Sequence, residues 1–357
     1  MHTTELHPLP SASLGTERVL TVHRFGTPGA RPKVYIQAGI HADELAANLT
    51  AHHLAEKLSS ADVVGEIILV PLANALGQSQ NINRVHLGRS DLATGSNFNR
   101  SYPDVSEAVK ARNPSTTQEA RRFVGEELAK KKPLLEKQVL QHTLITMAHD
   151  ADIVLDLHTD SDAEMHLYLD PDQWPSAKDL AHWLGARVVM LARNSGDNPL
   201  EETVAAPFIA CGVEAPLTVV VELRGKADVA DDLASQDADA LFHFLQGRSV
   251  ITGDPGTPPD CDSVAALFEH TAYAIPEVPG IIAYKKNVGD MVQTGDVVAE
   301  IVDVRKINGA RTPVHAPTSG RMFARSLAKL ARPGMSIATI FGTEPVKGRD
   351  KGNLLGD

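Results

Sequence analysis

Five short apolar runs constrain the fold of this chain more than any other feature of its sequence. They cover residues 34–36, 65–72, 152–157, 187–191 and 217–223. Helical patterns lie between or after them, over residues 44–59, 116–147 (interrupted at Pro133), 176–185 and 229–246. Buried strands that alternate with helices are typical of a mostly parallel sheet with helices on both faces. We therefore predict a mixed, mostly parallel α/β sheet flanked by helices, with residues 17–25 as an additional edge strand.

Composition changes after the last of these helices. Residues 253–259 hold two glycines and three prolines, which is typical of a linker. Residues 274–341 then show short strands separated by glycine turns, a pattern that predicts a small all-β unit. The predicted organisation is a large domain, a linker, a small β domain and a polar tail, over residues 1–252, 253–262, 263–346 and 347–357.

The charge and cysteine content exclude several classes of protein. The formal net charge is −11 without a sustained basic run, whereas nucleic acids and anionic membranes bind clustered lysine and arginine. The two cysteines fit neither a disulfide framework nor a paired-cysteine zinc site, which favours a reducing compartment. Residues 1–11 show no signal-peptide pattern, and no apolar run approaches the roughly 20 residues of a membrane span. We expect a cytoplasmic protein that binds neither nucleic acid nor membrane.

Three candidate metal ligands follow two of the predicted strands. His41 and Glu44 lie in a strand-to-helix turn, and His158 directly follows the strand at residues 152–157. Open α/β sheets bind their ligands at the carboxyl ends of strands. Two histidines and a carboxylate suit zinc, which keeps a fourth position for water, lowers the pKa of that water and polarises a carbonyl. Without His158, the pair in the turn would indicate a surface histidine and a helix-capping glutamate.

Glu222 is a single acid inside the apolar run at residues 217–223. A carboxylate in such a run is costly unless it has a partner or a function. Near a metal it would act as a general base that takes a proton from water and returns it to the leaving amine. The alternative is an ion pair with Arg224, which the two-residue period of a strand would place on the same face.

Four motifs in this order resemble a known family. They are HADE at residues 41–44, NFNRSYPD at 97–104, DLH at 156–158 and the isolated Glu222. Together they are similar to the succinylglutamate desuccinylase/aspartoacylase family, a branch of the zinc carboxypeptidase superfamily, over roughly residues 30–245. The resemblance implies a zinc carboxypeptidase-like fold with one zinc ion per chain on His41, Glu44 and His158. It also implies that Glu222 is the general base.

The same resemblance assigns substrate-binding residues in the polar loop before residue 104. Asn99 and Arg100 match the pair that clamps a substrate carboxylate, and a guanidinium can bind both oxygens of such a group. Arg84 takes the place of the arginine that polarises the scissile carbonyl and holds its oxyanion. Arg89 lies in the same loop and is the alternative for that role.

The predicted function is a zinc-dependent amidohydrolase that removes a short acyl group from an N-acyl amino acid or a related small amide. No match is found for the second arginine that binds a dicarboxylic amino acid, and ELRG at residues 222–225 resembles relatives that deacetylate N-acetylated diamino acids. Asp160, Asp162 and Glu164 would favour an amine-bearing substrate or else form a solvated acidic loop. The rival within enzymes is a zinc metallocarboxypeptidase, which uses the same atoms on a peptide C-terminus.

The C-terminal unit resembles the biotinyl/lipoyl carrier fold, through NVGDMVQTGDVVAEI at residues 287–301 and HAPTSG at 315–320. A carrier presents a modifiable lysine at a hairpin tip, but Gly309 occupies that position and Lys306 lacks the expected flanking residues. We expect a structural cover or a contact in a homo-oligomer. A lipoyl-like binding or carrier protein with a degenerate hydrolase domain is the alternative from another class of protein.

Overall fold

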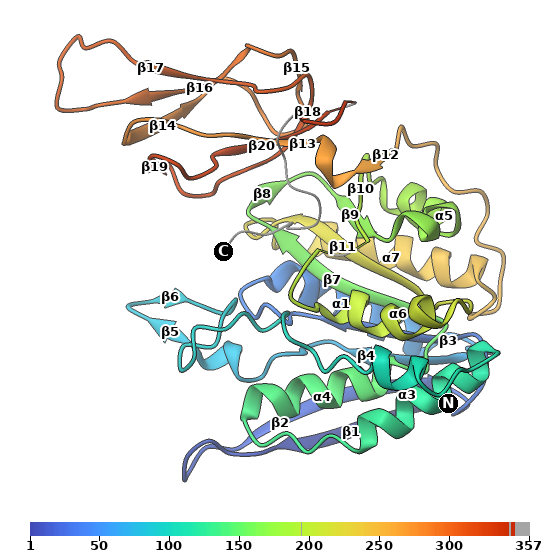
Figure 1. Ribbon diagram of the computed structural model, residues 1–357. Coiled ribbons are helices and arrows are strands. Elements are labelled where there is room, and N and C mark those ends of the chain that lie inside the picture. Colours follow the sequence, from blue (N-terminus) through green and yellow to red (C-terminus); the bar gives the residue numbers. More distant parts are fainter. Residues whose placement is uncertain (194, 343, 347–357) are drawn as a thin grey trace.

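The computed structural model describes residues 1–193, 195–342 and 344–346, and the predicted polar tail lies outside this range. Its centre is a nine-stranded sheet in the order β1-β2-β4-β3-β7-β11-β9-β10-β12 (Figure 1). These strands are β1 His2–Leu9, β2 Arg18–Gly26, β3 Lys33–Ala38, β4 Glu66–Val70, β7 Ile153–Asp160, β9 His166–Leu169, β10 Val188–Leu191, β11 Leu217–Gly225 and β12 Val264–Leu267. Strands β4, β3, β7 and β11 are parallel, and β9 pairs antiparallel with β11. The predicted mixed α/β sheet is confirmed.

Helices cover both faces of this sheet. The helices are α1 Leu45–Ser59, α2 Ser106–Lys110, α3 Thr117–Ala129, α4 Glu136–Ala148, α5 Trp174–Leu184, α6 Leu200–Cys211 and α7 Asp231–Gly247. One buried apolar cluster joins one sheet face to α1, α5 and α7, and a second joins the opposite face to α3, α4 and α6. Alternation along β3 shows why both faces are buried, since Val34 and Ile36 pack in the first cluster and Tyr35 packs in the second.

Two strands of the N-terminal half were not predicted. β1 is the edge of the sheet and β2 is paired on both sides, so the prediction of an edge strand at residues 17–25 is wrong. β1 is largely exposed, and its pairing with β2 rather than a buried apolar run defines it. β9 is buried but four residues long, which is too short for a reliable periodic signal.

The long polar loop before α2 is mostly irregular, as predicted. It contains the 3₁₀ turn η1 Gly77–Ser79 and a short hairpin of β5 Asn81–Ile82 and β6 Val85–His86. The predicted helix at residues 116–147 is divided into α3 and α4 by a segment that contains Pro133. Two further 3₁₀ turns are η2 Pro171–Gln173 and η3 Phe268–His270.

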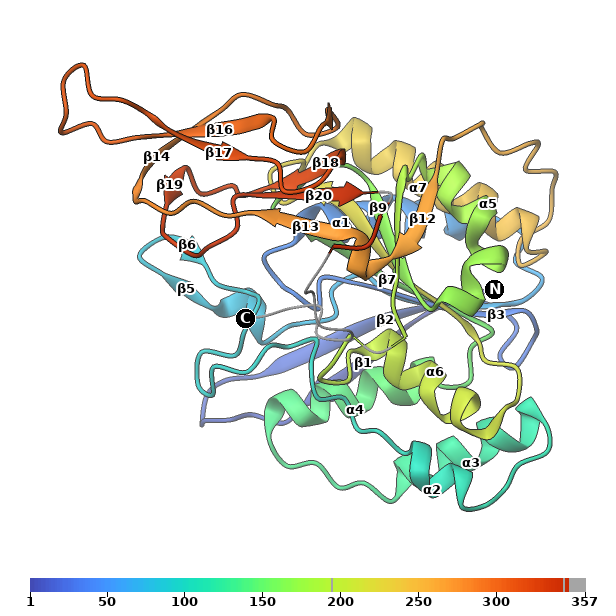
Figure 2. The same cartoon turned by 45° about the horizontal axis from the view of Figure 1, so that its top comes forward.

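After β12 and η3 the described chain forms two small antiparallel sheets (Figures 1 and 2). Their strands are β13 Thr271–Ala274, β14 Gly280–Tyr284, β15 Met291–Val292, β16 Val297–Val302, β17 Thr312–His315, β18 Gly320–Arg325, β19 Leu330–Ala331 and β20 Ala338–Gly342. A likeness of this unit to a lipoyl carrier stays a prediction.

One strand from each side of the linker pairs in a sheet on the other side. β12 follows the linker but pairs with β10 in the large sheet, although residues 263–346 were expected to form a separate β domain. In the opposite direction, β8 Asp162–Ala163 precedes the linker but pairs with β18 in a small sheet. The predicted domain limits stay a prediction. In the strand pairing, β12 is the last strand of the large sheet, and β13 is the first strand after it that belongs to a small sheet.

No helix within the described residues is both long and apolar enough to cross a membrane.

Candidate active site

Three buried ligand atoms meet at the carboxyl ends of β3 and β7. The donor atoms of His41, Glu44 and His158 lie within 4.8 Å of one another. His41 Nδ1 is 3.0 Å from Glu44 Oε1, and His158 Nδ1 is 2.9 Å from Glu44 Oε2. Glu44 precedes α1 as its N-cap residue, but its side chain makes no capping hydrogen bond. The structure therefore brings the three predicted ligands together, and excludes the alternative of a helix-capping glutamate.

The turn between β3 and α1 is possible because Gly39 adopts φ = +72°, in the left-handed region that favours glycine. A Cβ atom there would lie 2.3 Å from the Asn48 side-chain nitrogen, so a larger residue does not fit. Asn48 in turn donates to Pro71 O over 2.6 Å. The glycine thus turns the chain so that His41 and Glu44 follow directly at the end of the strand.

Both imidazoles are held through their second nitrogen. His41 Nε2 lies 2.9 Å from Asn97 Oδ1, and His158 Nε2 lies 3.0 Å from Asp156 Oδ2. A proton on each Nε2 leaves the lone pair of each Nδ1 toward Glu44, as expected for metal-ligating histidines with an outer hydrogen-bond acceptor. Asp156 itself accepts from Gln37 Nε2 over 2.9 Å.

The charges around this cluster favour a bound cation. Without a bound ion, Nδ1 of His41 and His158 can instead carry a proton toward Glu44; burial would raise the pKa of Glu44, but these charges and hydrogen bonds hold it well below the usual value. Burial would likewise lower the pKa of His158, yet Asp156 and Glu44 raise it well above the usual value. The buried carboxylates of Glu44 and Asp156 thus depend on positive charge between them. The nitrogen and oxygen donors of the cluster fit zinc.

Glu222 lies on β11 in register with His158 of β7. Its Oε2 atom is buried and finds no hydrogen-bond partner within the described residues. Burial raises the pKa of Glu222 to about 8, with Glu44 and Asp160 contributing in the same direction. A carboxyl with a pKa near neutrality, beside the candidate metal ligands, suits a group that takes up and returns a proton.

Arg224 does not pair with Glu222, so that alternative is wrong. The register of β11 on β7 shifts between Glu222 and Gly225, and Arg224 has φ = +62°. This irregularity breaks the two-residue alternation and directs Arg224 to Asp237 of α7, with which it forms an ion pair.

The structure separates the two candidate arginines. Arg84 is exposed in the turn of the β5–β6 hairpin and does not line the pocket at the metal ligands. Arg89 Nη1 lies 3.3 Å from His41 Nδ1 and 3.7 Å from Glu44 Oε1. Of the two arginines, Arg89 therefore lies beside the candidate metal ligands and Arg84 does not, and the catalytic role of either stays a prediction.

A close backbone contact explains the position of Arg89. Ala42 N donates to Gly88 O over 2.9 Å. A Cβ atom on Gly88 would lie 2.3 Å from Asp43 N, so only glycine permits this approach. The contact fixes the next residue, Arg89, beside the ligand turn.

Asn99 and Arg100 differ in what they can offer a ligand. Asn99 is buried and lies 3.3 Å from both Asp156 Oδ2 and His158 Nε2 through its Nδ2 atom. Arg100 donates from Nη1 to Asn99 O over 2.7 Å and forms no salt bridge within the described residues. Gln141 of α4 donates to the carbonyls of Phe98 and Arg100, which holds this segment against the sheet.

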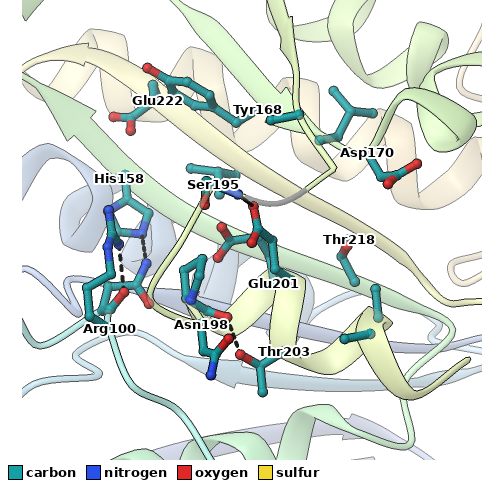
Figure 3. Close-up of a pocket in the computed structure, with 18 of the residues that line it drawn as sticks. Arg100, His158, Tyr168, Asp170, Ser195, Asn198, Glu201, Thr203, Thr218 and Glu222 are labelled. Carbon is teal, nitrogen blue, oxygen red and sulfur yellow. Dashed lines mark hydrogen bonds between the residues drawn. The ribbon is translucent and has the colours of Figure 1, made fainter. Parts of the chain in front are cut away.

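These groups line one cavity of about 650 Å³ (Figure 3). Besides Arg89, the predicted alternative to Arg84, its walls include several residues that the sequence did not single out, namely Tyr168, Asp170, Ser195, Asn198, Glu201, Glu202 and Thr218. Glu201 is the most unusual, because its Oε2 atom is buried without a partner in the described chain and burial raises its pKa to about 8. Acidic residues in the first turn of a helix are common, so the sequence carried no signal for a pocket role of Glu201.

The three acids after His158 have different positions. Asp160 lines the cavity. Asp162 and Glu164 instead bind Arg325 and Arg321 of β18, at 2.7 Å and 3.4 Å. A simple solvated loop is therefore wrong for this segment, and of the three only Asp160 could face a substrate.

A family model for the succinylglutamate desuccinylase/aspartoacylase catalytic domain matches residues 30–248. The chain belongs to this family. This confirms the resemblance seen in the HADE, NFNRSYPD and DLH motifs and Glu222, and the zinc carboxypeptidase-like superfamily is consistent with it.

Relatives cover almost the whole chain. The N-alpha-acetyl-L-2,4-diaminobutyric acid deacetylase of Halomonas elongata is 22% identical over 319 residues, which are 87% of this chain and 82% of that protein. A solved succinylglutamate desuccinylase/aspartoacylase family protein from Shewanella amazonensis has a TM-score of 0.86 and 25% identity, and covers 96% of this chain and 99% of its own. The product-bound ectoine utilization protein EutE (DoeB) from Ruegeria pomeroyi has a TM-score of 0.71 at 17% identity, over 96% and 95%. Family members thus share the fold through the C-terminal strands.

Proposed function

We propose that this chain is a zinc-dependent deacylase that hydrolyses the amide bond of a small N-acyl amino acid. The observation that carries the proposal is the buried His41–Glu44–His158 cluster, with the unpartnered carboxyl of Glu222 on the adjacent strand. Family membership and the deacetylase activity named for the Halomonas relative support the same class of reaction.

His41, Glu44 and His158 would hold the metal ion, with Asn97 and Asp156 fixing the two imidazoles. When bound, zinc supplies Lewis acidity, which polarises a carbonyl and makes water acidic near neutral pH. This chemistry needs a proton acceptor beside the site, and Glu222 is the carboxyl in that position.

Each of the other side chains of the pocket would have a separate role in the reaction. Glu222 accepts a proton from the attacking water and delivers it to the nitrogen of the leaving amine, so the C–N bond breaks with no net change on Glu222. The guanidinium of Arg89 would stabilise the negative charge that develops on the carbonyl oxygen. Arg100, which has no ion-pair partner in the described chain, would bind the carboxylate of the amino acid, with Asn99 positioning that segment.

A direct test combines metal content with substrate hydrolysis. Protein purified without added metal should contain close to one zinc per chain, and His41→Ala with His158→Ala should abolish it. The zinc-loaded protein should hydrolyse N-acetyl amino acids, including N-acetyl-2,4-diaminobutyrate, faster than dipeptides. Preference for dipeptides would indicate a carboxypeptidase instead.

Glu222→Gln separates catalysis from binding. It should retain zinc and the fold but lose about 10²- to 10⁴-fold in turnover, because the general base is absent. Zinc content and thermal unfolding provide the control. Turnover close to wild type would remove Glu222 from the mechanism, and a matched loss of zinc would show that it acts as a ligand.

A further inference from the structure

The cavity extends well beyond the metal ligands, between α6 and β11. Along β11, Thr218, Val220 and Glu222 line it at the two-residue period of one strand face. Because a strand rises about 3.3 Å per residue, Thr218 lies about 13 Å from Glu222. Ala206, Ile209 and Ala210 of α6 line the same cavity, in which Figure 3 labels Glu201 of α6 and Thr218 of β11.

This distal groove, lined by Leu169, Ala206, Ile209, Ala210, Thr218 and Val220, is apolar. Ile209 is 50% exposed, although a helix face open to solvent is normally polar. Val220 is 7% exposed and Thr218 is 3% exposed, so the floor is shielded by the walls.

The polar groups around the distal groove are already bonded. The Thr218 hydroxyl donates to Gln173 Oε1 over 3.3 Å, and Asp170 accepts from Asp172 N over 2.8 Å. Arg193 at the rim forms two hydrogen bonds to Asp172, at 2.7 and 2.8 Å. These polar groups are thus held by neighbouring protein groups, and a ligand in the distal groove meets mainly the apolar side chains named above.

We propose that the substrate carries an apolar chain that lies in the distal groove, an inference that rests on the proposed deacylase function. The groove is continuous with the metal site, so the chain belongs to the same molecule as the scissile amide. A length of about 13 Å accommodates roughly eight to ten carbon atoms in extended form, with C–C bonds of about 1.5 Å. The chain is either the acyl group or the amino-acid side chain, and the contacts described are the same for both.

Two substrate series distinguish these sources with the zinc-loaded wild-type protein. One extends the acyl group of N-acyl-L-alanine from acetyl to decanoyl. The other keeps the acetyl group and extends the side chain from alanine through norleucine to 2-aminodecanoate. In one series kcat/KM should rise about three- to fourfold per methylene until the groove is filled.

Failure of this inference is distinct from failure of the proposed function. If kcat/KM falls as either chain grows, or if only N-acetyl-2,4-diaminobutyrate is hydrolysed, the groove assignment is overturned. The proposed deacylase function is not affected by that result. No hydrolysis of any of these amides overturns both.

Substitutions in the groove provide a second measure. Ala206→Phe should lower the ratio of kcat/KM for long over short substrates by about tenfold or more, because the ring occupies the volume of several methylenes. Ile209→Ser should lower the same ratio about threefold or more. Its matched control is Ile275→Ser, since Ile275 is 48% exposed but follows β13 and does not line the cavity. Unchanged ratios in folded Ile209→Ser protein would also overturn the assignment.

Discussion

Arg89 and Arg84 belong to one irregular loop, but of the two only Arg89 reaches the candidate metal ligands. Arg89→Ala should lower kcat by about 10²- to 10³-fold, the usual cost of removing a donor to a developing oxyanion. Arg84→Ala is the matched control and should stay within about twofold of wild type, because Arg84 is exposed in a hairpin turn. Steady-state kinetics of both variants check the assignment. A large loss in Arg84→Ala with normal Arg89→Ala would reverse it.

Glu201 is a second carboxyl group of the pocket with a raised pKa. Burial, with Asp156 and Glu202 nearby, raises the pKa of Glu201 to about 8 from its ordinary value of 4.5. Between these two values the folded protein keeps a proton that the unfolded chain has released. The contribution of Glu201 to the free energy of unfolding is therefore lost progressively as pH rises from about 4.5 to 8, and is constant above that range.

Glu201→Gln removes this titration. The free energy of unfolding of the variant, relative to wild type, should increase by about 1 to 3 kcal/mol between pH 4.5 and pH 8.5. Urea unfolding of the metal-free proteins at both pH values measures the difference. A constant difference across that range would show that Glu201 is already ionised in the folded protein.

The sequence predicted some site residues and missed others for a physical reason. His41, Glu44 and His158 follow buried strands, and the carboxyl ends of neighbouring parallel strands must lie together. Arg89, predicted only as an alternative, reaches the same cavity through a loop contact at Gly88. Glu201, which was missed, reaches it from the first turn of α6, and neither segment has a periodic pattern. The resemblance could name an arginine in the loop, but only the packing of Gly88 decides which one.

At the scale of elements, the strand that carries His158 is linked to the C-terminal sheets. β7 leads directly into β8, which pairs with β18 through Asp162 and Ala163. Arg325 of β18 lies 2.7 Å from Asp162, and both side chains are about one quarter exposed, at 23% and 29%. The C-terminal strands therefore support the segment that follows His158.

Arg325→Ala tests this support. The loss of a partly buried ion pair should cost about 1 kcal/mol and lower the melting temperature by roughly 2 to 4 °C, with a several-fold decrease in kcat/KM. Arg305→Ala is the control, since Arg305 pairs with Asp303 in the same unit but is 83% exposed. Thermal unfolding and kinetics of both variants are the measurements. Identical behaviour of the two would mean that the β8–β18 contact does not support the site.

Strand pairing explains which elements the sequence did not reveal. β12 follows the proline-rich linker and is a strand of four residues, VAAL, that is only partly buried, so neither its length nor its surroundings in the sequence mark it as part of the large sheet. It becomes a strand because β10 offers an edge for a parallel pair. Such pairing depends on the assembled sheet, whereas β3, β7 and β11 are recognisable from their own composition.

At the scale of the whole molecule, the metal should contribute to stability. A ligand that binds only the folded protein adds about 2.7 kcal/mol at a free concentration one hundred times its dissociation constant. Removal of zinc by a chelator should therefore lower the melting temperature by several degrees, and added zinc should restore it. His158→Ala protein should show no such response. A wild-type melting temperature that does not change on chelation would contradict a tightly bound ion at this cluster.

The position of β7 between β3 and β11 has a consequence for biosynthesis. The ligand turn after β3 is made early, but His158 and then Glu222 emerge only after the loop, α3 and α4 have been synthesised. Contacts between segments so far apart in sequence close late in folding, because a long loop must be ordered first. An ion that requires all three ligands therefore joins a sheet centre that is already paired. The ion can stabilise the folded protein, but the order of the strands has to be determined by the polypeptide chain before the ion binds.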